Sequence, residues 1–112
     1  MVGVSETLNL AKNLNLDLKI LHDVISTSTG SCWALNNYCP LPNIGPKSPA
    51  DNNYLPGFSA ELMAKDLKIA IKAAQNSKTK TRFGAIAETM YSDMAKGSNG
   101  KKDFSAIIKE II

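Results

Sequence analysis

The chain has 112 residues, enough for one domain with a modest core, and its 44% hydrophobic and 21% charged residues are ordinary for a folded globular protein. No apolar run approaches the ~20 residues that span a bilayer, so we expect no membrane partner. The net charge of +3 is uneven, because residues 1–56 hold three lysines and four acidic residues, whereas residues 57–112 hold ten basic and six acidic residues. This basic half either attracts an anionic cofactor or is simply a solvated surface. Since aromatic residues do not interleave it, we expect no nucleic-acid partner.

Residues 1–28 predict two helices joined by a tight turn. The first helix should end near Asn15, because Asn tolerates the left-handed conformation that closes many helices. Asp17 stands where the second helix needs its N-cap. The apolar face of the first helix comprises Val4, Leu8 and Ala11, and that of the second comprises Leu18, Leu21, Val24 and Ile25. His22 lies at the edge of the second face, where packing is a more ordinary role than catalysis.

Two cysteines, Cys32 and Cys39, follow this helical pair. A zinc site needs about four ligands, which two cysteines and one histidine do not supply. A disulfide scaffold is disfavoured by the low cysteine density. We therefore expect free thiols in a reducing compartment and no metal.

All five prolines lie between Pro40 and Pro56. This density predicts a loop without regular helix or central strand, and a long ordered loop in a compact domain is commonly functional. A long helix is then predicted over residues 58–76, and a second begins near Phe83. The apolar stripe of the second helix comprises Phe83, Ile86, Ala87, Met90, Tyr91 and Met94.

A glycine-rich stop at residues 97–100 ends this helix, and Asp103 is expected to cap a last one. Its apolar residues are Phe104, Ile107, Ile108, Ile111 and Ile112. No segment alternates with a period of two, and no repeat is evident. The sequence therefore predicts an all-α domain of five or six helices with one proline-rich loop.

One group of residues on the 58–76 helix suggests binding. Phe58 and Lys65 are two helical turns apart and so nearly in line, with Asp66 next to Lys65. An ammonium group just beyond an aromatic ring could bind a phosphate, a ribose or a carboxylate of a ligand. Judged from spacing alone, a solvated basic stripe of Lys65, Lys68 and Lys72 is the favoured alternative.

Residues Gly57–Ala70 resemble the Leu-Met-x-Lys-Asp-Leu-x-x-Ala helix of the β-hydroxyacid dehydrogenases, a family that shares its helical domain with 6-phosphogluconate dehydrogenase-like enzymes. The segments Gly30–Trp33 and Asn52–Tyr54 are similar to the matching loop of the 3-hydroxyisobutyrate dehydrogenase branch. Lys101–Ser105 also matches. Together these similarities cover almost the whole chain.

The resemblance implies a part of an enzyme that oxidises 3-hydroxyisobutyrate to methylmalonate semialdehyde with NAD in valine breakdown. It implies that Lys65 contacts the bound nucleotide and that Phe58 and Asp66 border the nicotinamide and substrate cleft. Trp33 either lines this cleft or is a core aromatic residue. The implied partners are an amino-terminal Rossmann domain, a small hydroxyacid substrate and further copies of the enzyme. The location would be the mitochondrial matrix in a eukaryote and the cytoplasm in a bacterium.

The chain departs from the family at the catalytic lysine. That lysine lies in a Gly-x-x-x-x-Lys-x-x-Asn-Asn motif, whereas Lys12 has Thr7 in place of the glycine and no paired asparagines. We therefore expect residues 1–112 to be the carboxy-terminal helical domain without its Rossmann domain, to hold no catalytic residue and to be inactive alone. Two alternatives are a non-enzymatic helical interaction module and the same domain of a related hydroxyacid dehydrogenase.

Overall fold

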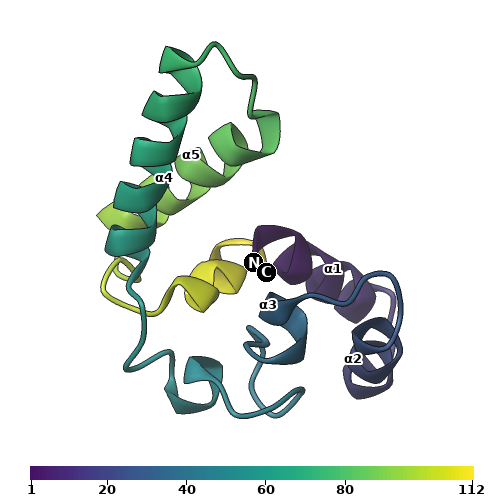
Figure 1. The fold of residues 1–112 in the computed structure, drawn as a ribbon. Helices are drawn as coiled ribbons and strands as arrows, with labels where there is room; N and C mark the ends of the chain where they lie inside the picture. The colour runs from purple at the N-terminus through teal and green to yellow at the C-terminus, as the bar shows by residue number, and fades with distance from the viewer.

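The computed structural model describes all residues from Met1 to Ile112 and contains helices but no strand (Figure 1). The predicted all-α fold is therefore confirmed. In chain order the elements are α1 (Val2–Asn13), α2 (Leu18–Ser26), α3 (Trp33–Asn36), η1 (Pro49–Asn52), α4 (Ala60–Asn76), α5 (Arg82–Lys96) and η2 (Phe104–Glu110), where η denotes a 3₁₀-helix. None of these helices combines the length and the apolar character needed to cross a membrane.

Helices α1 and α2 form the predicted hairpin. Asn15 takes the left-handed conformation (φ 56°), and Asp17 caps α2 by accepting hydrogen bonds from the amides of Lys19 and Ile20 at 2.9 and 3.0 Å. Leu8 and Ala11 are buried as predicted. These local signals are sufficient to predict the turn between the two helices, because each acts within a few residues of it.

The predicted buried face of α2 is wrong in part. Val24 is 58% exposed, whereas His22, expected at the edge, is only 6% exposed. The reason is that α2 packs against α3, where the His22 Nε2 atom lies 3.1 Å from the carbonyl oxygen of Leu35. His22 is therefore a buried histidine whose polar ring is satisfied by the backbone.

The proline-rich region contains no α-helix, but it does contain the 3₁₀-helix η1, which was not predicted. Pro49 occupies its first turn, where a missing amide hydrogen costs nothing. Asp51 accepts hydrogen bonds from the amides of Ser48 and Asn43, both at 2.8 Å, and these bonds hold the pKa of its carboxyl group below the ordinary value. The loop is thus held by its own polar side chains.

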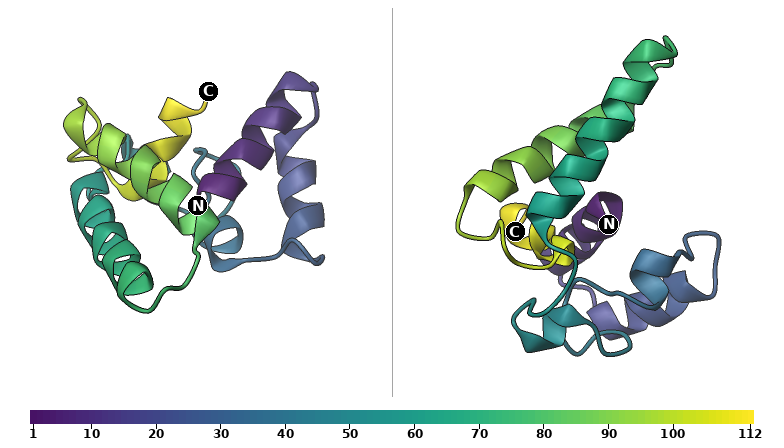
Figure 2. Two further views of the ribbon diagram at one scale, coloured as in Figure 1. Left: turned by 90° about the horizontal axis from the view of Figure 1, so that it is seen from above. Right: turned by 60° about the vertical axis from the view of Figure 1, so that its left-hand side comes forward.

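Helices α4 and α5 form an antiparallel hairpin that extends away from the rest of the molecule (Figures 1 and 2). α4 begins at Ala60 rather than at Phe58, since Ser59 accepts from the amide of Leu62 as its N-cap. Only the base of the hairpin packs on the core. The predicted apolar stripe of α5 is consequently buried only at its carboxyl end, while Phe83 is 89% exposed and Ile86 58% exposed.

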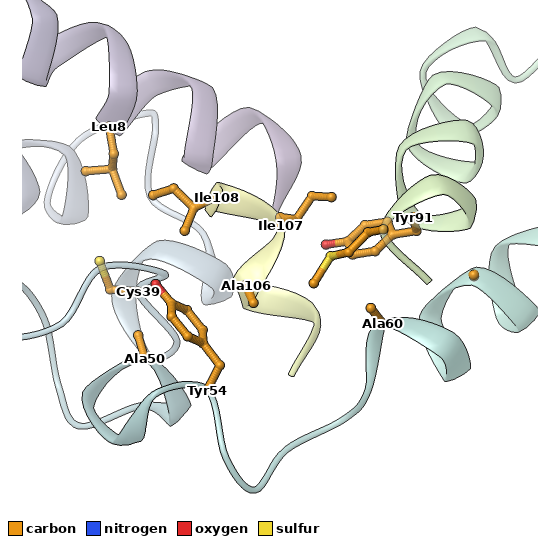
Figure 3. Close-up of a cluster of buried hydrophobic side chains, with 11 residues drawn as sticks. Leu8, Cys39, Ala50, Tyr54, Ala60, Tyr91, Ala106, Ile107 and Ile108 are labelled. Carbon is orange, nitrogen blue, oxygen red and sulfur yellow. The ribbon is translucent and has the colours of Figure 1, made fainter. Parts of the chain in front are cut away.

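The last segment, η2, passes through the centre of the domain (Figure 3). Ser105, Ala106, Ile107 and Ile108 are all buried, because η2 contacts α1, η1, α4 and α5. The prediction of an amphipathic α-helix here is wrong. Residues 105–108 are buried on all sides and so need no polar face. The tighter helix is held by bonds between residues three apart, such as that from the Ala106 amide to the Asp103 carbonyl at 2.9 Å.

Candidate cofactor and substrate site

Lys65 lies on the open face of α4. Its side chain is 64% exposed, and its Nζ atom is 3.6 Å from the carboxylate of Asp66, which is itself 54% exposed. The buried residues of α4 are Ala60 and Ala64. At 100° per residue Lys65 is roughly 140° around the helix from Ala60, so its side chain emerges on the side away from the core.

Two apolar side chains share this open face of α4. Leu62 is 44% exposed and Ile69 is 62% exposed, and helical geometry places both on the side that faces away from Ala60. Lys68 and Lys72 are also exposed. The face therefore combines ammonium groups with exposed aliphatic surface, which a purely solvated basic stripe does not require.

Trp33 and Phe58 belong to one row of aromatic rings. Trp33 stacks on Tyr38 with ring centroids 4.8 Å apart, Tyr38 stacks on Phe104 at 5.5 Å, and Phe104 meets Phe58 edge-on at 6.2 Å. We call these four residues the aromatic row. Its two ends are open, since Trp33 is 59% and Phe58 39% exposed. The alternative of Trp33 as a core aromatic residue is therefore wrong.

A buried carboxylate holds the aromatic row. Asp103 has no exposed surface and accepts hydrogen bonds from the Tyr38 hydroxyl at 2.9 Å, from the Phe58 amide at 2.8 Å and from the Ser105 amide at 2.9 Å. The Ser105 hydroxyl is a fourth donor. Burial, together with the hydrogen bond to Asp103 and its charge, raises the pKa of Tyr38 to about 12.

The sequence did not point to this role of Asp103. It predicted Asp103 only as a cap, which is confirmed by the bond to Ser105. The remaining contacts reach across the fold to Tyr38 and Phe58, and no local spacing announces them. The one hint in the sequence is Gly57, just before Phe58. A glycine is required there because a Cβ atom would overlap the Asp103 carboxylate.

The structure does not bring every predicted site residue together. Lys65 pairs with its neighbour Asp66, and no hydrogen bond, ion pair or cation–π contact joins it to the aromatic row. Both cysteines are free, as predicted, with Cys32 exposed and Cys39 buried. No group of three or more His, Cys, Asp or Glu side chains is arranged to hold a metal ion.

A separate apolar groove of about 660 Å³ lies between the start of α1 and the α4–α5 hairpin. It is lined by Met63 and Leu67 from α4 and by Phe83 and Ile86 from α5. None of Trp33, Phe58, Lys65 and Asp66 lines it. Phe104 is the one member of the aromatic row that also lines this groove.

The sequence of this all-helical domain matches a known class of NAD-binding domains. The family described as "NAD-binding of NADP-dependent 3-hydroxyisobutyrate dehydrogenase" matches residues 1–111. The chain belongs to this NAD-binding family.

Individual relatives agree with this assignment. The mitochondrial 3-hydroxyisobutyrate dehydrogenases of Drosophila melanogaster and Homo sapiens are 39% and 38% identical over 107 and 109 residues, which are 96% and 97% of this chain. A 3-hydroxyisobutyrate dehydrogenase of Mycobacterium tuberculosis, solved with L-serine, is 38% identical and superimposes with a TM-score of 0.93 over 98% of the chain. The chain spans about a third of the length of the curated relatives, 33% and 32%, and 38% of the solved one.

Proposed function

We propose that this domain supplies the helical side of the cofactor and substrate cleft in an NAD-dependent 3-hydroxyisobutyrate dehydrogenase, which forms methylmalonate semialdehyde in valine breakdown. Lys65 contacts the bound nucleotide, Phe58 and Asp66 border the cleft, and Trp33 lines it. The observation that carries the proposal is the exposure of Lys65 on the open face of α4 in a chain of this family.

The chemistry of these side chains suits such a ligand. NAD carries an anionic pyrophosphate, for which an ammonium on a flexible stem is a suitable point charge. Planar rings such as the nicotinamide pack on the faces of aromatic side chains, and Trp33 presents an open face. Hydride transfer also needs the cofactor held rigidly, so we propose that a Rossmann domain elsewhere in the whole enzyme binds most of the nucleotide.

Titration with NADH tests the role of Lys65. Trp33 is the only tryptophan, so quenching of its emission by energy transfer to the reduced nicotinamide reports binding beside it. We expect Lys65→Ala to weaken binding about tenfold, which is the loss of about 1.4 kcal/mol expected of one charge-assisted contact. Lys72→Ala is the matched control, because Lys72 is an exposed lysine two turns further along α4. Equal losses in both variants would instead identify a solvated basic stripe.

A second proposal concerns self-association, as in an interaction module. Phe83 and Ile86 line the apolar groove and are exposed, and monomeric proteins rarely leave such contiguous apolar surface uncovered. We propose that a second copy of the chain covers it. Light scattering should show a mass that rises with concentration, and less so for Phe83→Ser; a constant monomer mass would contradict the proposal.

The substrate and the location are further parts of the proposal. Relatives named as mitochondrial and relatives from bacteria both exist. We propose the mitochondrial matrix for a eukaryotic source and the cytoplasm for a bacterial one. Comparison of 3-hydroxyisobutyrate with glycerate and 4-hydroxybutyrate as substrates of the whole enzyme separates this assignment from that of a related hydroxyacid dehydrogenase.

A further inference from the structure

Asp103 is a fully buried carboxylate that takes part in no ion pair of the structure. All four groups that surround its oxygens are donors, which suits a side chain that only accepts. An isolated buried charge is costly unless hydrogen bonds replace its water. A hydrophobic residue of similar size would leave the Tyr38 hydroxyl and the Phe58 and Ser105 amides without their acceptor, so the carboxylate is needed to join these groups.

The donors come from three separate segments. Tyr38 lies in the loop after α3, Phe58 lies just before α4, and Ser105 is in η2. The backbone strengthens the same junction, since the Phe104 amide donates to the Phe58 carbonyl at 2.7 Å and the Asp103 amide to the Tyr54 carbonyl at 3.0 Å. Asp103 is therefore the point at which the two outer parts of the aromatic row are joined to the centre of the domain.

Trp33 is not held by burial, because more than half of its surface is exposed. Its aromatic neighbour is Tyr38, whose ring lies between Trp33 and Phe104. The orientation of the Tyr38 ring is set at its far end by the hydroxyl bond to Asp103. Rotation of Tyr38 would therefore remove the surface on which Trp33 stacks.

We propose that Asp103 and Tyr38 are positioning residues, which align Trp33 and Phe58 as one wall of the cleft without touching the ligand themselves. Asp103 fixes Phe58 through its backbone amide and Trp33 through the ring of Tyr38. The identity of the ligand at this wall rests on the proposed function, whereas the alignment of the wall does not.

The central experiment compares two variants that each remove one phenolic hydroxyl. Tyr38→Phe keeps the stacking ring but removes the donor to Asp103. Tyr54→Phe is the matched control, because the Tyr54 hydroxyl donates to the Pro40 carbonyl at the same distance of 2.9 Å but belongs to no part of the aromatic row. Far-UV circular dichroism checks that both variants are folded.

Trp33 emission and its quenching by acrylamide report the geometry of the row. We expect Tyr38→Phe to shift the emission and to raise the quenching constant about twofold, because the ring at position 38 is no longer held by Asp103 and covers the inner face of the indole less completely. Tyr54→Phe should leave both unchanged. Unchanged emission in Tyr38→Phe, or equal changes in the two variants, overturns the proposal. Asp103→Asn provides a second variant, in which the same shift of Trp33 is expected.

An NADH titration of the same variants separates this proposal from the proposed function. Weaker NADH binding by Tyr38→Phe, but not by Tyr54→Phe, supports both. A Trp33 shift in Tyr38→Phe, together with a whole enzyme whose NADH binding is the same for the parent form and for Lys65→Ala, supports the positioning role and contradicts the assignment of the ligand. NADH binding to all variants without a Trp33 shift overturns the positioning role alone.

Discussion

Gly57 is a position at which the addition of one methyl group should have a large effect. A Cβ atom there would lie 2.1 Å from the Asp103 Oδ2 atom and 2.6 Å from both Cβ and Cγ of Asp103. Real Cβ contacts are never this short, so either the carboxylate or the chain around Gly57 must move. Asp103 is fully buried and bonded on both oxygens, which leaves it no free space to enter.

The cost of Gly57→Ala follows from what has to move. Overpacking a filled site costs about 1–3 kcal/mol. Displacement of Oδ2 also weakens its bonds from the Phe58 amide and the Tyr38 hydroxyl, and a bond to a charged group contributes about 1.5–3 kcal/mol. Because the backbone relaxes in part, we expect a net loss of about 3 kcal/mol, a large share of the ~5–15 kcal/mol typical of a domain.

Urea denaturation followed by circular dichroism measures this loss. Gly3→Ala is the control, since a Cβ atom at Gly3 meets nothing within 4 Å and Gly3 lies in α1. That change should stabilise the chain by up to about 1 kcal/mol, as expected of alanine in a helix. A loss below about 0.5 kcal/mol for Gly57→Ala, within the range of ordinary surface substitutions, would refute the tight junction at Asp103.

Three further predictions concern pH, capping and activity. The pKa of Tyr38 is about 12 in the folded chain against an ordinary value of 10.0. The unfolded chain therefore releases this proton first, and the free energy of unfolding should fall between about pH 10 and about pH 12. Urea denaturation should show a smaller fall for Tyr38→Phe, and an equal fall would contradict this contribution. Asp17→Ala removes the acceptor of two α2 amides and should cost about 1 kcal/mol in the same assay, whereas no loss would mean that water replaces the cap. The 112-residue chain alone should not reduce NAD with 3-hydroxyisobutyrate, and any turnover traceable to it would overturn the inference that the catalytic lysine lies elsewhere.

Local signals in the sequence were enough for the hairpin of α1 and α2 and for its turn. Asp17 caps α2 through amides only two and three residues away, and Asn15 closes the turn before it through its own backbone conformation. These features depend on neighbours in the chain, so the sequence by itself determined them.

Only the tertiary structure decided which apolar faces are buried and what Asp103 does. The stripe of α5 is apolar along its length, yet just its carboxyl end meets η2, because the hairpin extends beyond the core. Asp103 has donors 65 and 45 residues away in the chain at Tyr38 and Phe58. Contacts at such separations depend on how whole segments pack. A periodic apolar pattern shows which face of a helix can be buried, but it does not show which segment packs against that face.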